Sequence, residues 1–144
     1  ECNDTELREA EVMDACENCN ACVKSCPTGA LSEDRFYVRS DKCLTFFNET
    51  AVPWPEYVES AWDTDSNCVV GCMKCQSACP ANRKQKDWVE MAGVFSEKET
   101  RELMNNTGKE GLSGHTLEKL EKLYMTEYIP TLSRNLGILF AGTG

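Results

Sequence analysis

The chain has 144 residues, of which 24 are acidic and 15 are basic, so its formal net charge at pH 7 is −9. This acidic surplus argues against general nucleic-acid binding, which depends on Lys and Arg side chains. No basic stretch followed by an apolar run opens the sequence, and no apolar run approaches the length that a transmembrane helix needs. We therefore expect no nucleic-acid or membrane contact from this segment, and a cytoplasmic location.

Short elements are expected on either side of the first cysteines. Residues 5–15 have the periodicity of a helix. Residues 36–38 form an apolar run between polar flanks, which predicts a brief strand. Pro55 is expected to open a helix over residues 56–62.

The first cysteine block reads Cys16-x2-Cys19-x2-Cys22-x3-Cys26-Pro27. This is the spacing of bacterial [4Fe–4S] proteins, in which the fourth cysteine ligates the other cluster of a pair. Two intervening residues let successive thiolates surround one cubane, while the longer gap before Pro27 directs the fourth thiolate away. The block therefore predicts three ligands for one cluster and one ligand for a second.

The second block reads Cys72-x2-Cys75-x3-Cys79-Pro80 and repeats the last three cysteines of the first. Such a duplication predicts two similar sites. The position that would match the first cysteine of the run is Val69. The missing ligand must come from elsewhere, and the sequence offers Cys43 and Cys68 as candidates.

Two ligand sets follow if each block gives its last cysteine to the other cluster. The first cluster takes Cys16, Cys19, Cys22 and Cys79. The second takes Cys26, Cys72, Cys75 and either Cys43 or Cys68. This crossing makes the fold of the cysteine-rich region depend on metal. Electron transfer is the expected chemistry, and no catalytic residue is identified.

The residues after the second block predict helices. Ser96 and Glu99 fit a capping box that starts a helix ending near residue 106. A second helix is expected over residues 116–128. Pro130 is expected to interrupt the helical pattern, and the residues after it have a third apolar face at helical spacing. We expect this helical region to contact the cysteine-rich region through the side chains of Leu117, Leu120, Leu123, Leu136 and Phe140.

Zinc and disulfides explain the cysteine spacing less well than iron–sulfur clusters do. Structural zinc uses paired C-x2-C units but gives no reason for a third cysteine and an x3-Cys-Pro end, and such close spacing is awkward for disulfides.

Cys2 has no motif around it and is expected to be a free thiol. His115 is expected at a solvated helix start. The basic residues Arg83, Lys84 and Lys86 indicate a solvated flank of the second block, and a docking site for an acidic partner is the alternative.

Residues 16–30, 41–44 and 71–82 together resemble the iron–sulfur region of the epoxyqueuosine reductase family. Corrinoid-dependent reductive dehalogenases look similar here, but more distantly. The resemblance covers about residues 16–82. In the family an isolated cysteine between the blocks completes the second cluster, which implies Cys43 rather than Cys68.

The resemblance also implies that a corrinoid-binding catalytic domain precedes the clusters, so a corrinoid is expected only in a domain outside this chain. The expected fold is α+β, mostly helices and loops, with a ferredoxin-like double-cluster region over residues 1–83 and a helical region over 84–144. The expected function is that of an electron-relay module of a larger reductase. Its partner would be the catalytic domain of the parent chain or a redox protein. A free-standing carrier and a structural metal domain without redox role are the alternatives.

Overall fold

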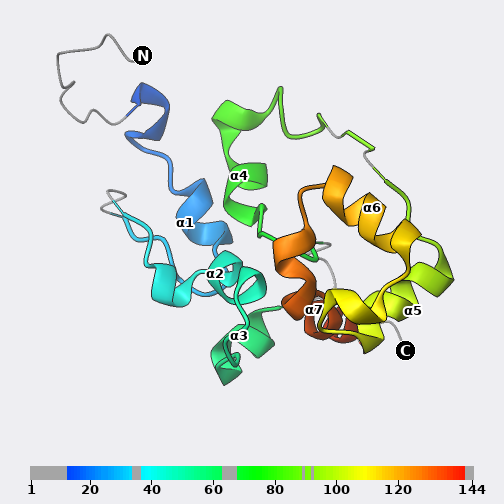
Figure 1. Cartoon of the computed structure of the whole chain (residues 1–144). Coiled ribbons are helices and arrows are strands. Elements are labelled where there is room, and N and C mark those ends of the chain that lie inside the picture. The colour runs from blue at the N-terminus through cyan, green and yellow to red at the C-terminus, as the bar shows by residue number, and fades with distance from the viewer. Residues whose placement is uncertain (1–12, 34–36, 63–67, 89, 92, 142–144) are drawn as a thin grey trace, which may run out of the picture.

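The computed structural model describes residues 13–33, 37–62, 68–88, 90–91 and 93–141. Within them the α-helices are α1 (Ala21–Ser25), α2 (Leu44–Glu49), α3 (Glu56–Ala61), α4 (Lys74–Ala78), α5 (Glu97–Asn105), α6 (Gly114–Lys122) and α7 (Ile129–Ala141). Short 3-10 turns connect them: η1 (Asp14–Cys16), η2 (Ser40–Lys42), η4 (Pro80–Asn82), η5 (Lys109–Gly111) and η6 (Thr126–Tyr128). In Figure 1 the elements up to α4 form one side of the molecule and α5 to α7 form the other.

The architecture is mostly helical rather than α+β. Strand pairing in the described ranges is limited to one isolated antiparallel bridge between Leu31 and Val38. The predicted strand at residues 36–38 therefore reduces to a single bridge at Val38, and Phe36 lies outside the described residues. Most of the predicted helix at 5–15, and Cys2, also lie outside them. Among the described residues, no helix is long and apolar enough to cross a membrane.

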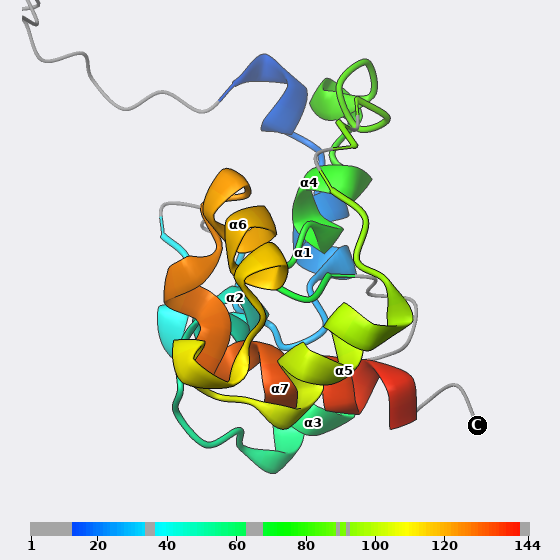
Figure 2. The same ribbon diagram turned by 45° about the vertical axis from the view of Figure 1, so that its right-hand side comes forward.

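The duplicated blocks form two similar helices that pack against each other. Helices α1 and α4 have the same length, lie side by side in Figures 1 and 2, and each ends at a Cys-Pro pair. The amide of Cys26 closes the turn on Val23 at 3.3 Å, and that of Cys79 does the same on Gln76 at 3.2 Å. Since proline has no N–H to continue the helix, both helices end where the chain turns into the next segment.

The predicted helix starts at Pro55 and Ser96 are confirmed. The carbonyl of Pro55 accepts the amide of Val58 at 2.8 Å and opens α3. The Ser96 hydroxyl accepts the amide of Glu99 while the Glu99 carboxylate accepts the amide of Ser96, which is the reciprocal pattern of a capping box.

The C-terminal helices differ from the prediction at three places. Helix α6 starts earlier, at Gly114 with Ser113 as its cap, and ends at Lys122 because Tyr124 adopts a positive φ of 55°. Pro130 does not interrupt a helix but lies in the first turn of α7, where its missing N–H costs nothing. Phe140 was predicted to contact the cysteine-rich region, yet it is 52% exposed.

Two apolar cores meet along α7. The larger core buries residues of α5, α6 and α7 and one residue of the loop before α6: Leu103, Leu112, Leu120, Ile129, Leu132 and Leu136. The smaller core buries residues of α2 and α3 with Trp62: Leu44, Phe47, Val58 and Trp62. Val69 and Val70 pack on the larger core, and Ile138 and Leu139 of α7 pack on the smaller one. Helix α7 thus joins the two predicted regions, whose division at residue 83 stays a prediction.

Candidate iron–sulfur sites

The first site is a small cavity lined by four cysteines. Cys16 comes from η1, Cys19 from the loop after it, Cys22 from α1, and Cys79 from the C-terminal end of α4. The cavity measures about 30 Å³, and its other lining residues are Ala15, Ala21, Pro80 and Ala81. These are the four cysteines that the sequence predicted for the first cluster, and three of them lie within seven positions of the chain.

The second site is a larger cavity, of about 200 Å³, that is also lined by four cysteines. Cys26 follows α1, Cys75 lies in α4, Cys72 precedes α4, and Cys43 caps the N-terminus of α2. Apolar side chains complete much of the wall: Pro27, Ala30, Leu31, Val38 and Leu44. Each cysteine block therefore contributes its last cysteine to the cavity that the other block lines.

The contact between α1 and α4 explains this crossing. Because the two helices are adjacent, the residue that follows the end of either helix reaches the site formed by the other. Ser25 lies at this contact and donates from its hydroxyl to the carbonyls of Cys22, at 3.1 Å, and Lys74, at 3.5 Å. The repeated x3-Cys-Pro ends thus place Cys26 and Cys79 on opposite sites.

Backbone N–H groups surround the sulfur of Cys26. The amide of Ala30 donates to Cys26 Sγ at 3.2 Å, and Gly29 makes the turn with a φ of 64° that favours glycine. Burial alone would raise the pKa of the Cys26 thiol, but the N–H groups of Leu31, Ala30 and Thr28 outweigh it, so the pKa lies below its usual value. The loop favours a thiolate at this position.

Cys72 and Cys75 lie in a different environment. Burial raises the pKa of both thiols. Within the same cavity, Cys43 and Cys75 raise the pKa of Cys72 further, and Cys26 and Cys43 raise the pKa of Cys75 further. Several thiolates crowded into one apolar cavity repel one another unless a cation compensates them. The second site therefore combines a donor set that needs positive charge with walls that keep water away.

Asn48 ties the segment of Cys72 to the helix of Cys43. Its side-chain amide donates to the carbonyl of Gly71 at 2.5 Å, and its Oδ1 accepts the amide of Gly71 at 3.0 Å. Gly71 has a φ of 81°, a conformation that side chains beyond glycine rarely adopt. The fully buried Asn48 lies on α2, which begins directly after Cys43, so this bidentate pair sets the position of Cys72 relative to Cys43.

Helix α7 supports the same segment from the other side. The side chain of Asn135, also fully buried, donates to the carbonyls of Asn48, at 2.7 Å, and Val69, at 2.8 Å. Arg134 donates to the carbonyls of Phe47, at 2.7 Å, and Val52, at 2.8 Å. No motif in the sequence indicates these residues, because they bind backbone carbonyls of segments that are distant in the chain.

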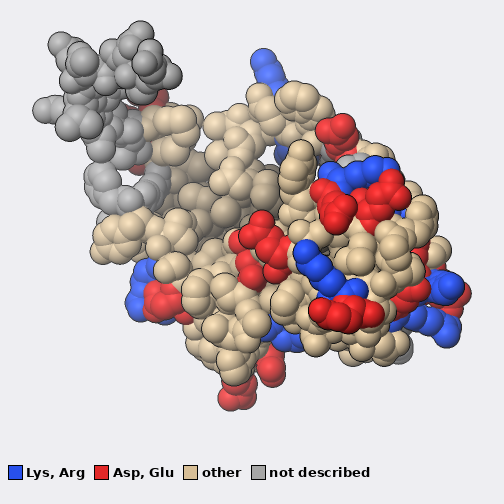
Figure 3. Space-filling view, viewed as in Figure 1, with Lys and Arg blue, Asp and Glu red and all other residues tan. Residues whose placement is uncertain are grey.

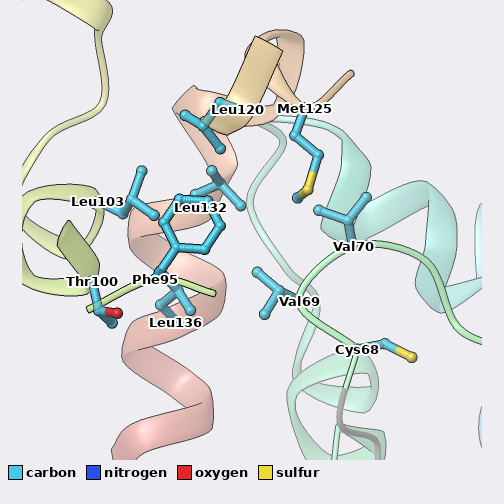
Figure 4. A pocket seen from close by; sticks show the side chains of 10 residues that line it. All are labelled: Cys68, Val69, Val70, Phe95, Thr100, Leu103, Leu120, Met125, Leu132 and Leu136. Carbon is cyan, nitrogen blue, oxygen red and sulfur yellow. The ribbon is translucent and has the colours of Figure 1, made fainter. Parts of the chain in front are cut away.

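Cys68 lies on another cavity. It lines an apolar cavity of about 450 Å³ between the residues before α4 and the C-terminal helices. Figure 4 shows Val69 and Val70 pointing toward Phe95 and Met125, whereas the thiol of Cys68 points away from them. Cys68 is near enough to raise the pKa of Cys72, but it does not line the cavity that holds Cys72 with three other cysteines.

The donor sets fit a four-iron cluster. Each cavity offers four thiols, which is the number of thiolates that hold a [4Fe–4S] cubane. All nine cysteines in the described ranges are free thiols. Across the same ranges, no group of three or more His, Cys, Asp or Glu side chains is arranged to hold a single metal ion.

Comparison with known families supports the interpretation of this region. Residues 15–82 match the model of a family described as a 4Fe-4S double cluster binding domain. The chain therefore contains a 4Fe–4S cluster binding domain. The matched stretch contains all eight of the cysteines that line the two cavities.

The similar proteins include epoxyqueuosine reductases, so the predicted resemblance is confirmed. The chain is 36% identical to the epoxyqueuosine reductase of Bacillus anthracis over 72 residues, which are 50% of this chain and 18% of that protein. It is 36% identical to that of Gloeobacter violaceus over 83 residues, 57% of this chain and 24% of the relative. It is also 38% identical over 80 residues, 56% of this chain, to an uncharacterised protein in the gldA 3′ region of Geobacillus stearothermophilus, of which the match covers 35%.

The matches thus span between about a sixth and about a third of the relatives' own lengths. No solved structure matches the chain.

Proposed function

We propose that the chain holds two [4Fe–4S] clusters and transfers electrons as part of an oxidoreductase. The observation that carries this proposal is the division of eight cysteines into two separate cavities, four to each, with one cysteine exchanged between the blocks. The matching family, whose description names a double cluster, supports it. When bound, each cluster exchanges one electron between core charges of 2+ and 1+.

The two ligand sets follow from the cavities. Cys16, Cys19, Cys22 and Cys79 would hold the first cluster, and Cys26, Cys43, Cys72 and Cys75 the second. Cys43 is preferred to Cys68 because it lines the same cavity as the other three thiols. This crossed arrangement is what a ferredoxin-like double-cluster region requires.

The protein tunes the second site through its own groups. The N–H groups of the turn after Cys26 favour the thiolate, and hydrogen bonds to a ligating sulfur shift a cluster's reduction potential. Leu44 and Ala30, each 2% exposed, exclude water from the cavity wall. Among the described residues that line the first site, the apolar side chains other than cysteine are those of alanine and proline.

We further propose that the chain is the relay module of a larger, epoxyqueuosine-reductase-like enzyme. The similarity to epoxyqueuosine reductases, of which the matches cover 18% and 24%, supports this assignment. A corrinoid would then belong to a domain outside this chain, and that domain or a redox protein would be the partner. A high density of metal-ligating thiols fits a reducing compartment, which favours the cytoplasm.

Reduction under anaerobic conditions tests the electron-transfer role. After reconstitution with iron and sulfide, dithionite should reduce the chain by about two electrons and produce an EPR signal from interacting spins. The oxidised sample is the control and should give no such signal. A chain that takes up zinc without sulfide, and gives no reducible signal, would contradict the proposal.

Three single variants test the crossed ligation. Cys16→Ala and Cys79→Ala should weaken the same cluster signal, although these residues belong to different blocks. Cys26→Ala should weaken the other signal, although Cys26 and Cys79 occupy equivalent positions in the repeat. If Cys16→Ala and Cys26→Ala affected one signal and Cys79→Ala the other, each block would hold its own cluster and the proposed sets would be wrong.

A further inference from the structure

Helix α4 has an outer face that the candidate cluster sites do not use. Its inward residues include Cys75, and Cys79 follows its end, whereas Met73, Gln76 and Ser77 are exposed. These exposed residues have the i, i+3, i+4 spacing of one helical face. Met73 is 57% exposed, so this face presents an apolar side chain to solvent next to the cysteines.

The segment after α4 folds back and forms a groove with this face. The groove measures about 510 Å³ and is lined by Met73, Gln76, Ser77, Asn82, Gln85, Lys86, Trp88 and Glu90. We call these residues the α4 surface. Asn82 fixes the return of the chain because its side-chain amide donates to Oε1 of Gln76 at 2.7 Å and to the Gln76 carbonyl at 3.1 Å.

The α4 surface adjoins both candidate cluster sites. Gln76 lines the groove and also the cavity of the second site. Pro80 and Ala81, directly before Asn82, line the cavity of the first site. A protein bound in the groove would therefore contact a residue, Gln76, that also lines the second site.

The composition of the surface favours a protein partner. Trp88 is 85% exposed and Met91, close to it in the chain, is 79% exposed. Tryptophan and methionine are enriched at the cores of protein interfaces, and an exposed cluster of them is uncommon on a surface that stays in water.

The charge of the surface specifies the partner further. The groove itself is lined by one basic and one acidic side chain, Lys86 and Glu90, and the exposed Arg83 and Lys84 lie just before Lys86, so this stretch is locally basic in a chain whose net charge is −9. In Figure 3 a basic side chain projects at the top of the molecule, in the region where the segment after α4 lies in Figure 1. Oppositely charged surfaces steer the encounter of two proteins and suppress wrong partners.

We propose that the α4 surface is the docking site of a separate, acidic electron-carrier protein. This inference rests on the proposed function. In the transfer step the reduced carrier would lose one electron and become oxidised, and Cys26, Cys43, Cys72 and Cys75 would hold the [4Fe–4S] group that accepts this electron, with no proton or bond exchanged. Lys84 and Lys86 attract the carrier, Trp88 packs against it, and Gln76 lies between it and the cluster.

A pair of matched double variants tests the proposal on the reconstituted chain. An acidic plant-type [2Fe–2S] ferredoxin serves as the probe, with its affinity measured by calorimetry in the oxidised state and its electron transfer by stopped-flow mixing. Lys84→Glu/Lys86→Glu should lower both the affinity and the second-order rate constant about tenfold at low ionic strength, and the difference should shrink at high salt. Lys98→Glu/Lys109→Glu changes the net charge equally on exposed residues of α5 and η5, and should change both less than about twofold.

A third variant separates packing from charge. Trp88→Ala should weaken binding about tenfold at low and at high salt. Equal effects of the two double variants would overturn the proposal. So would a wild-type chain that does not bind the probe, or a surface that binds phosphatidylglycerol vesicles or folded RNA in place of the probe. Dithionite reduction of the same samples reports on the clusters alone, so the docking surface can fail while the proposed function stands.

Discussion

The two candidate cluster sites use the same cysteine spacing but are built differently. The first is lined by three cysteines within seven positions and by one from the end of α4, so local spacing nearly suffices to form it. The second draws its four cysteines from around α1, from the start of α2 and from around α4, and its segments are held together by Asn48 and Asn135. The repeat thus became asymmetric at Val69, which packs on the C-terminal core instead of ligating.

This difference explains what the helical region does for the domain. Because α7 binds the carbonyls of residues 48 and 69, the second site depends on a helix that lies more than fifty residues beyond it in the chain. The first site has no such support from α5, α6 or α7 among its described lining residues. We therefore expect perturbations of the helical region to affect the second site and spare the first.

The largest expected effect is the loss of the second cluster in Cys43→Ala. Removing one of four thiolates should lower the iron content from about eight to about four per chain, as measured after anaerobic reconstitution. Cys68→Ala is the matched control and should keep about eight, because Cys68 lines the apolar cavity. The opposite result would make Cys68 the fourth ligand.

Replacing a buried leucine by alanine should have different consequences in the two cores. Leu44 and Leu120 are 2% and 1% exposed, so replacing either by alanine should lower the free energy of unfolding by about 2–5 kcal/mol. Leu44 also lines the second cavity, so Leu44→Ala should in addition change the reduction potential of one cluster in a redox titration, whereas Leu120→Ala should leave both potentials unchanged. Equal potentials in the two variants would show that the wall of the cavity does not tune the cluster.

The buried asparagine of α7 should matter for one site only. Asn135→Ala leaves the buried carbonyl of Asn48 and the part-buried carbonyl of Val69 without this donor, and it should lower the free energy of unfolding by about 1–3 kcal/mol. Cluster release under mild denaturant, followed by visible absorbance and EPR, should begin at the second site. Asn105→Ala, at an exposed position of α5, is the control and should change neither measurement. Simultaneous release from both sites would argue against the asymmetry.

The smallest expected effect concerns acid stability of the helical region. Hydrogen bonds from Lys119 and from Ser96 lower the pKa of Glu99 to about 2, from an ordinary value of 4.5. Because the folded pKa is depressed, the ionised carboxylate stabilises α5 and α6 fully above about pH 4.5, and this contribution is lost as the pH falls toward 2. The protection factors of the Leu103 and Leu120 amides in hydrogen exchange should therefore fall over this window.

Variants of two glutamates check this assignment. Glu99→Gln should remove most of the pH dependence of these protection factors between about pH 4.5 and 2, whereas Glu97→Gln, whose side chain is 80% exposed, should preserve it. If both variants kept the wild-type dependence, another carboxylate would control the acid stability of α5 and α6.

The sequence was most informative where chemistry is encoded by spacing. The repeated x3-Cys-Pro ends predicted which cysteines the structure would bring together, and Ser96 and Pro55 predicted helix starts because their caps are local. Cys43 could be chosen over Cys68 only through the family resemblance, since no local pattern distinguishes the two.

What depends on distant contacts was not predicted. Tyr124 ends α6 through its own backbone conformation, and Phe140 has the spacing of a core residue but lies beyond the part of α7 that is covered. Asn48 and Asn135 are recognisable as positioning residues only once α2 and α7 are known to be adjacent. A helical pattern likewise could not show that Trp88 stays exposed beside α4.

The central claim is that this chain holds two four-iron clusters on two crossed sets of cysteines. The most direct measurement is the content of iron and acid-labile sulfide per chain after anaerobic reconstitution, with the chain concentration determined by amino-acid analysis. We expect about eight of each. About four of each would show that only one of the two cavities holds a cluster and would contradict the claim, and zinc without sulfide would contradict the iron–sulfur assignment of both cavities.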